Sequence, residues 1–216
     1  MTMQASSIQI SAAEVVLEGN LDVPADARGI VLFAHGSGSS RHSPRNRYVA
    51  QVLQQAHLAT LLMDLLTPDE EAEDVITARL RFNILMLARR VIGATDWLAN
   101  NPATRDLRIG YFGASTGAAA ALVAAAERPG AVHAVVSRGG RPDLAGASLA
   151  RVRAPTLLIV GGRDPAVIDL NQEALAKLTV EKQLRIVPGA THLFEEPGAL
   201  EQVGTLARGW FGKRLS

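Results

Sequence analysis

The sequence predicts an α/β fold: a mostly parallel, doubly wound sheet with helices on its two faces. Three observations lead to this prediction. Short runs of Val, Ile and Leu alternate along the 216-residue chain with longer stretches in which apolar residues recur at helical spacing. The short runs are bounded by Gly, Pro or Asp, as is typical of strands buried inside a parallel sheet. No internal repeat, linker or low-complexity tract interrupts the pattern, which indicates a single domain over residues 1–216.

The expected elements follow from these patterns. An antiparallel lead-in pair is expected at Ile8–Ile10 and Glu14–Val23, followed by buried strands at Gly29–Phe33, Ala59–Met63, Leu107–Phe112, Val132–Ser137, Thr156–Val160 and Leu184–Val187. Helices are expected over about Arg45–His57, Glu73–Asn100, Ser115–Arg128, Asp169–Leu178 and Gly198–Lys213. The second of these helices is preceded by T-P-D-E at residues 67–70, a capping-box pattern with proline at the first helical position.

Composition limits the classes of function. Hydrophobic residues make up 48% of the chain, enough for a sizeable core. The formal net charge is +1 with Lys and Arg scattered, which argues against a nucleic-acid or membrane-surface partner. The chain has no cysteine, so disulfides, thiolate–zinc sites and a cysteine nucleophile are excluded. Neither a signal-peptide pattern nor an apolar run of ~20 residues is present, so we expect a cytoplasmic protein.

The strongest functional motif is G-A-S-T-G at residues 113–117, which follows an expected strand and precedes an Ala-rich helix. A G-x-S-x-G string alone is weak evidence, but a sharp strand-to-helix turn requires small residues on both sides of its centre. Such a turn projects the serine hydroxyl above the sheet at a helix N-terminus, where the dipole favours developing negative charge. Ser115 is therefore the candidate nucleophile. The alternative interpretation is a Gly-Ser turn that only caps the helix.

A serine nucleophile needs a base, and the base needs an acid that orients it. On this type of strand–turn–helix scaffold both follow the serine, the acid first. Only His133 and His192 follow Ser115. His133 begins an apolar strand, where a structural role is expected, whereas His192 lies in a loop between the last strand and the last helix. His192 is the candidate base.

The candidate acid is Asp164, which directly follows the expected strand at residues 156–160. Functional residues of open α/β sheets gather at such carboxyl ends of strands. Asp169 is a competitor, although its position suggests the cap of the next helix. Asp143, which follows the preceding strand, is a weaker competitor.

Acyl transfer also requires two backbone N–H donors for the oxyanion. The residue after the nucleophile, Thr116, is expected to supply one. The other is expected from the H-G-S-G-S-S loop at residues 35–40, where Ser37 is our choice and Gly38 the alternative. A phosphate-binding interpretation of this loop is weaker, because the lysine and spacing of a P-loop are absent. His35 is expected to hold the loop through ring hydrogen bonds.

With these residues in place, the chain resembles the dienelactone-hydrolase-like branch of the α/β-hydrolases. The resemblance rests on the H-G-S-G-S-S loop, the G-A-S-T-G turn, G-G-R-D at residues 161–164 and A-T-H-L-F at residues 190–194, and it extends from Ile30 to Phe211. It implies an α/β-hydrolase fold with an eight-stranded sheet, no metal, no organic cofactor and hydrolysis of an ester or lactone. Dienelactone hydrolases proper carry Cys as nucleophile where this chain has Ser115, which favours an ordinary acyl-serine route.

The sequence thus predicts a serine esterase of the carboxylesterase type, with small-molecule substrates that are short-acyl or lactone esters. A small serine peptidase or amidase is one alternative, and a non-catalytic ligand-binding module is another. About a dozen residues, Leu65–Ile76, remain to roof the site, so no separate lid domain is expected. Arg41, Arg45 and Arg138 lie in stretches similar to this branch; they either line the rim of the site or hold loops by ion pairs. The oligomeric state is left open.

Overall fold

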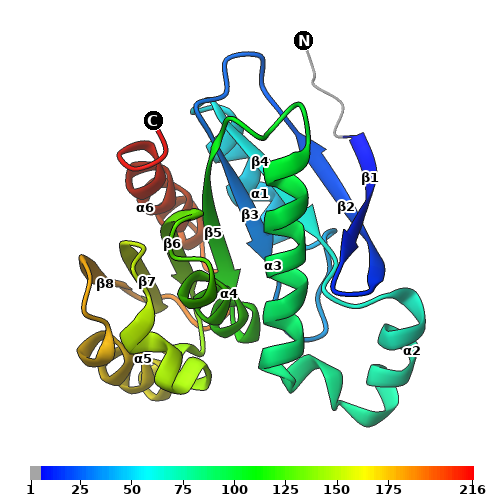
Figure 1. Ribbon diagram of the computed structural model, residues 1–216. Coiled ribbons are helices and arrows are strands. Elements are labelled where there is room, and N and C mark those ends of the chain that lie inside the picture. The colour runs from blue at the N-terminus through cyan, green and yellow to red at the C-terminus, as the bar shows by residue number, and fades with distance from the viewer. Residues whose placement is uncertain (1–5) are drawn as a thin grey trace.

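The computed structural model describes residues 6–216, which form one eight-stranded sheet in the order β1-β2-β4-β3-β5-β6-β7-β8 (Figure 1). Strands β3 to β8 are parallel, whereas β2 is antiparallel to both β1 and β4. The predicted α/β-hydrolase fold is confirmed. The strands are β1 (Ser6–Ala12), β2 (Val15–Asp22), β3 (Gly29–Ala34), β4 (Leu58–Met63), β5 (Arg108–Ala114), β6 (Val132–Arg138), β7 (Thr156–Gly161) and β8 (Lys182–Val187). Residues 1–5, which contributed to the expectation of no signal peptide, lie outside the described residues.

Helices cover both faces of the sheet (Figure 1). On one face α1 (Pro44–Gln54) packs against α6 (Ala199–Gly212). On the other face lie α3 (Ile84–Asn100), α4 (Thr116–Glu127), α5 (Pro165–Lys177) and the 3-10 segment η2 (Pro142–Arg151), which the sequence did not predict. Helix α4 is buried from its first residue to Ala126, because its alanines let the backbone pack closely on the sheet. Within residues 6–216 no helix combines the length and apolar character of a membrane span.

One strand departs from the predicted burial. The central strands β3, β4 and β7 are buried at every position, as expected for strands covered on both faces. Strand β8 is largely exposed, and its Ile186 retains 42% of its accessible surface. The reason is its position, because β8 is an edge of the sheet.

The predicted helix over Glu73–Asn100 is wrong, because the chain forms two helices there. The first, α2 (Pro68–Thr77), begins at the predicted cap. Thr67 Oγ1 accepts the Glu70 N–H at 3.2 Å, and a carboxylate oxygen of Glu70 accepts the Thr67 N–H at 2.8 Å. Helix α2 ends at Ala78, whose φ of 52° is left-handed, and the 3-10 turn η1 (Leu80–Phe82) leads into α3.

A buried carboxylate causes this break. Asp74, which is 1% exposed, accepts the N–H groups of Leu80 at 2.6 Å and Arg81 at 3.2 Å, and it pairs with the Arg81 guanidinium at 2.6 Å. These bonds satisfy backbone groups that a continuous helix would have used internally. The chain turns back at this corner, and α2 comes to lie beside the loop that follows β3.

Candidate active site

Ser115 occupies the turn between β5 and α4. Its φ of 49° and ψ of −123° belong to a region that a residue with a side chain adopts only under strain. The end of β6 and the residues that follow it hold the turn in place. The Ser115 N–H donates to the carbonyl of Arg138 at 3.3 Å, and the Arg141 N–H donates to the carbonyl of Ser115 at 3.1 Å. The serine therefore stands at the N-terminus of α4, where the helix dipole favours negative charge.

Close backbone contacts explain why small residues surround the serine. A Cβ atom on Gly117 would lie 2.2 Å from the carbonyl oxygen of Ala34 and 2.3 Å from that of His35. A Cβ atom on Gly36, in the loop after β3, would lie 2.9 Å from the Cβ of Ser115. The turn is thus packed directly against the end of β3 and the loop that follows it.

Asp164 and His192 form a hydrogen-bonded pair. Asp164 follows β7 and is the N-cap residue of α5, yet its side chain makes no capping hydrogen bond. Its Oδ2 instead lies 2.7 Å from Nδ1 of His192. With Nδ1–H donating to the carboxylate, Nε2 is left as the proton acceptor. No hydrogen bond joins His192 to the Ser115 hydroxyl among residues 6–216, and such contacts often close only when substrate binds.

The loop that carries His192 is held by residues that the sequence analysis missed. A carboxylate oxygen of Glu196 accepts the N–H of Thr191 at 3.0 Å, and the hydrogen bonds from Thr191 lower the pKa of Glu196. The Arg163 N–H donates to the carbonyl of Ala190 at 2.8 Å, which ties this loop to the one that carries Asp164. The sequence signal that could have identified Glu196 is its position four residues after His192 in the same short loop.

The two predicted oxyanion donors lie side by side. The hydroxyl oxygens of Ser37 and Thr116 are 2.9 Å apart and hydrogen-bonded. Thr116 is the buried first residue of α4, and Ser37 lies in a turn closed by the Ser39 N–H, which donates to the carbonyl of Gly36 at 3.2 Å. The turn continues through Gly38, whose φ is 63°. The choice between Ser37 and Gly38 as the second donor stays a prediction.

His35 fixes the same loop. Its Nδ1 lies 2.9 Å from the carbonyl of Gly36, and its Nε2 lies 3.0 Å from the backbone nitrogen of Leu65. Nδ1–H therefore donates while Nε2 accepts, which requires a neutral ring. Burial favours the same state, because it lowers the pKa of His35. The loop after β3 is thereby tied to the segment after β4.

Two of the arginines hold loops by ion pairs. Arg41 pairs with both Glu18 and Asp64, and its N–H donates to Asp64 at 2.7 Å. Arg45 pairs with Glu195, in the loop after His192, at 3.0 Å. Arg41 thus holds a loop, and it also lines a pocket. Its role at the rim of the active site stays a prediction.

Arg138 does not reach the rim of the site, because it is only 5% exposed. One guanidinium nitrogen donates to the side-chain oxygen of Asn46 at 3.3 Å, and the guanidinium carbon lies 5.7 Å from the centre of the Phe194 ring. Within residues 6–216 no carboxylate pairs with it. Burial and the nearby Arg45 lower the pKa of Arg138 to about 10.

The competing residues lie elsewhere. Asp169 is not the helix cap that the sequence suggested, because α5 already begins at Pro165 and Asp169 is exposed within it. Asp143 binds Arg141 through two hydrogen bonds of 2.9 and 2.8 Å. His133 lies at the start of β6, so it is at the opposite end of the sheet from Ser115.

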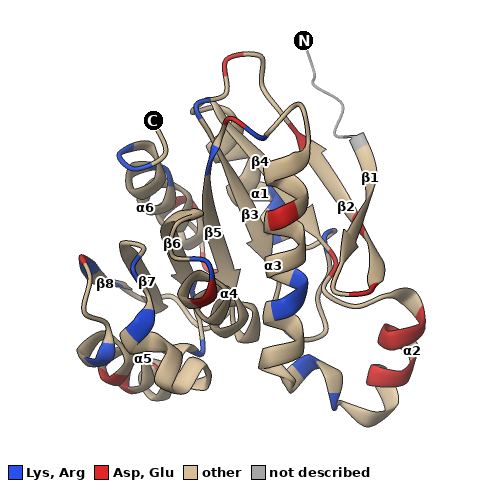
Figure 2. Ribbon diagram, viewed as in Figure 1, with Lys and Arg blue, Asp and Glu red and all other residues tan. Residues whose placement is uncertain are grey.

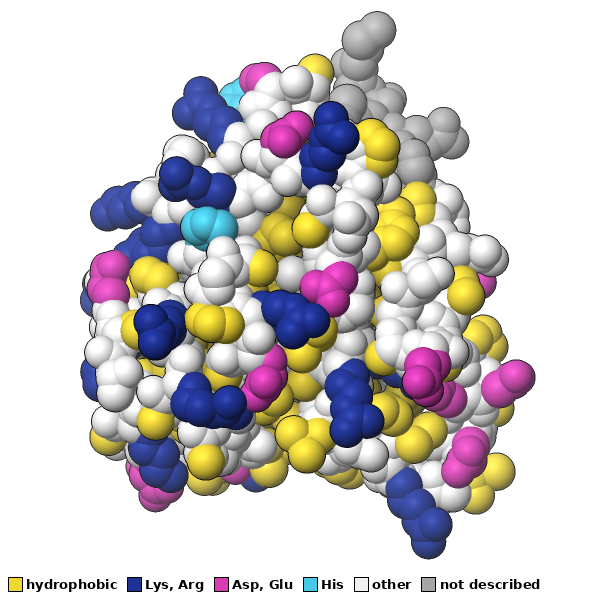
Figure 3. All heavy atoms as spheres, in the orientation of Figure 1, with side chains coloured by type: hydrophobic (Ala, Val, Ile, Leu, Met, Phe, Trp, Pro, Cys, Tyr) yellow, Lys and Arg dark blue, Asp and Glu magenta, His cyan; other side chains and the backbone are white. Residues whose placement is uncertain are grey.

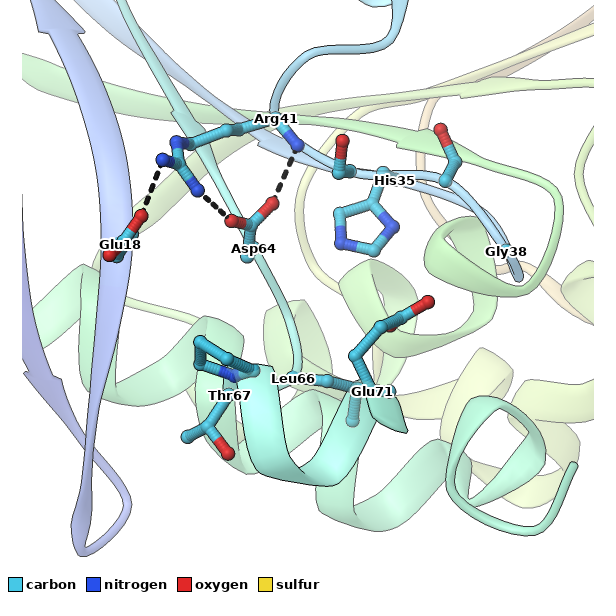
Figure 4. Close-up of a pocket in the computed structure, with 11 residues that line it drawn as sticks. Glu18, His35, Gly38, Arg41, Asp64, Leu66, Thr67 and Glu71 are labelled. Carbon is cyan, nitrogen blue, oxygen red and sulfur yellow. Dashed lines mark hydrogen bonds and ion pairs between the residues drawn. The ribbon is translucent and has the colours of Figure 1, made fainter. Parts of the chain in front are cut away.

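A pocket lies beside the predicted oxyanion loop (Figure 4). It has a volume of about 300 Å³ and is enclosed by the loop after β3, the first turn of α2, Glu18 and Asp64. A narrower hollow adjoins it and extends to Ser37 and Thr116. The residues expected to roof the site, about 65–76, thus include part of this lining.

The sequence matches the model of the dienelactone hydrolase family over residues 24–207. The chain belongs to the dienelactone hydrolase family. A crystal structure of a dienelactone hydrolase from Anabaena variabilis is 62% identical, with both chains covered in full and a TM-score of 0.98. Est1E from Butyrivibrio proteoclasticus is 15% identical, with 96% of this chain and 98% of that chain covered and a TM-score of 0.79, which shows a shared fold.

A relative from Mycobacterium tuberculosis is named a putative phosphoribosyl transferase. It is 62% identical over 204 residues, which are 94% of this family member but only 45% of that protein. The chain thus spans about half the length of the curated relatives it matches.

Proposed function

We propose that this member of the dienelactone hydrolase family is a serine esterase that hydrolyses short-acyl or lactone esters through an acyl-serine intermediate. One observation carries the proposal. Ser115 stands on a strained turn at a helix N-terminus, and an Asp164–His192 pair with a free ring nitrogen lies at the same edge of the sheet. A buried helix cap would need neither the strain nor the oriented histidine.

The proposed reaction has two displacements. Ser115 Oγ attacks the ester carbonyl carbon while Nε2 of His192 takes the hydroxyl proton, and Asp164 stabilises the resulting imidazolium. The N–H groups of Ser37 and Thr116 hold the oxyanion. The bond to the alcohol oxygen breaks, and that oxygen receives the proton from His192. Water then attacks the acyl-serine with His192 again as base, and the carboxylic acid leaves as Ser115 regains its proton.

The pocket supports small substrates. Its volume of about 300 Å³ is at the lower end for ligand sites. Apolar burial contributes roughly 0.8 kcal/mol per CH₂ only where a pocket encloses the chain. We expect kcat/KM for p-nitrophenyl esters to be greatest at acyl chains of about two to six carbons. A steady rise beyond decanoate would contradict this part of the proposal.

The deciding experiment uses p-nitrophenyl acetate and a fluorophosphonate probe. We expect turnover and covalent labelling by the unmodified protein. Ser115→Ala should abolish labelling and lower kcat by a factor on the order of 10⁴ or more, with the fold intact by circular dichroism. Ser11→Ala, which removes an exposed hydroxyl from β1, is the matched control and should change neither. A folded Ser115→Ala protein that retains most of its turnover would refute the proposal.

A further inference from the structure

The pocket beside the predicted oxyanion loop has an excess of negative charge. Its charged lining consists of three carboxylates, Glu18, Asp64 and Glu71, and one guanidinium, Arg41. Glu18 and Asp64 bind Arg41 from two sides, so its charge is compensated within the pocket (Figure 4). His35, which also lines the pocket, is neutral for the reasons given above.

Glu71 is the carboxylate without a protein partner. Among residues 6–216 its side chain makes no hydrogen bond or ion pair, whereas the preceding Glu70 serves the capping box and binds Arg90 at 2.7 Å. Figure 4 shows the Glu71 side chain rising from α2 toward His35 and Gly38. Because Glu71 lies in the first turn of α2, the helix dipole stabilises its negative charge.

Glu71 also lies close to the two predicted oxyanion donors. The narrower hollow is lined by Glu71 together with Ser37 and Thr116, the two predicted oxyanion donors. An ester whose carbonyl oxygen lies at these donors therefore places one of its substituents near the Glu71 carboxylate. The pocket beyond has space for a small polar group on that substituent.

We propose that this pocket selects esters that carry an ammonium group, and that Glu71 is the residue that determines this specificity. The inference rests on the proposed ester hydrolysis. The unpaired Glu71 carboxylate attracts the full positive charge of an ammonium group, whereas it does not attract a neutral group of the same shape. Helix α2 has five acidic residues and no basic one, and Figures 2 and 3 show acidic residues on the side of the molecule where α2 lies. Glu70 and Asp74 are paired with Arg90 and Arg81, so the unpaired negative charge that lines the pocket is that of Glu71.

The test compares charged esters with neutral esters of the same shape. Acetylthiocholine and 3,3-dimethylbutyl thioacetate place the difference in the leaving group, and p-nitrophenyl esters of betaine and 3,3-dimethylbutyrate place it in the acyl group. The ratio of kcat/KM, charged over neutral, is measured for the unmodified protein and for Glu71→Gln. Intrinsic ester reactivity cancels when the two proteins are compared. We expect the ratio for at least one pair to fall about tenfold in Glu71→Gln, because the variant loses the attraction between the carboxylate and the ammonium charge.

Two controls make the test decisive. Glu73→Gln removes an exposed carboxylate from the same helix outside the pocket and should leave the ratio unchanged. Raising the salt concentration should reduce the ratio of the unmodified protein, because added ions screen a partly exposed charge pair, and this readout needs no variant.

The proposal is overturned if both ratios are the same in Glu71→Gln and the unmodified protein, if Glu73→Gln has an equal effect, or if salt leaves the ratios unchanged. Failure of the proposed ester hydrolysis is recognised separately, because the unmodified protein would then turn over neither the neutral esters nor p-nitrophenyl acetate. That result would overturn both proposals.

Discussion

Replacing Gly117 with alanine tests how tightly the serine turn is packed. The new Cβ would lie 2.2 Å from the Ala34 carbonyl oxygen and 2.3 Å from the His35 carbonyl oxygen, far inside van der Waals contact. Both atoms belong to backbone at the end of β3, so neither can rotate away as a side chain would. Overpacking of this kind costs about 1 to 3 kcal/mol, and two rigid contacts favour the upper end. The affected His35 also begins the predicted oxyanion loop, so we expect kcat to fall with stability.

Gly209→Ala is the matched control. Gly209 lies on the exposed side of α6, and no atom is within 4 Å of the position its Cβ would take. Alanine in a helix interior is favoured over glycine by about 0.5 to 1 kcal/mol, so this variant should be more stable than the unmodified protein. The same chemical change therefore has opposite signs at the two positions.

The measurement is thermal or denaturant unfolding with p-nitrophenyl acetate hydrolysis in parallel. For a chain of this size about 1 kcal/mol corresponds to about 2 to 4 °C in Tm. Gly117→Ala should thus melt about 6 to 12 °C lower, and Gly209→Ala slightly higher. If Gly117→Ala is as stable as Gly209→Ala, the turn has space that the structure does not show, and the steric argument is refuted.

Three further predictions concern the site. Asp164→Asn should lower kcat by a factor of about 10³ to 10⁴ with little change in KM, because an amide stabilises neither the imidazolium nor the required His192 tautomer. A larger loss in Asp169→Asn would show that the catalytic acid was misassigned. Thr116→Val should lower kcat about tenfold, because it removes the hydroxyl that is hydrogen-bonded to Ser37. Thr116→Ser keeps a hydroxyl and should retain the kcat of the unmodified protein. Full activity of the valine variant would mean that this hydrogen bond does not position the oxyanion donors. Because burial lowers the pKa of His35, the unfolded chain binds a proton at a higher pH than the folded chain. The stability contributed by the neutral ring is therefore fully present above the unfolded pKa of about 6.5 and is lost as the pH falls below it. The free energy of unfolding falls by at most about 1.4 kcal/mol per pH unit. Denaturant unfolding of His35→Gln should show a weaker dependence between pH 7.5 and 5.5, and an unchanged slope would contradict a buried, neutral His35.

The strands and the serine turn could be predicted from the sequence because their signals are local. Each buried strand is a short apolar run with turn residues at both ends, and the observed bounds differ by at most two residues for the six parallel strands. Ser115, Asp164 and His192 each follow the end of a strand, so the parallel topology alone brings them to one edge of the sheet. Their catalytic roles remain a proposal.

The parts that could not be predicted depend on side-chain contacts that hydrophobic spacing does not reveal. The helical spacing continues past Ala78, and only the hydrogen bonds of the buried Asp74 side chain to the N–H groups of Leu80 and Arg81 show that the helix ends there. Nothing near Glu71 in the sequence indicates that its side chain borders the loop after β3, since that placement follows from the corner at Asp74. A local pattern can mark where an element begins, but it cannot show which partner a buried carboxylate will find.

Arg138 shows how the fold joins the parts of the site. Its carbonyl accepts the N–H of Ser115, and Gly139, the next residue, packs against the backbone of His192: a Cβ there would lie 3.0 Å from the His192 carbonyl oxygen. Its guanidinium lies between Asn46 of α1 and Phe194 of the histidine loop. Burying a cation without a carboxylate opposes folding, as its lowered pKa reflects. The protein keeps this unfavourable feature at a residue that contacts the serine turn, the first helix and the histidine loop. The end of β6 therefore links the serine turn to the first helix and to the loop that carries the predicted base, His192.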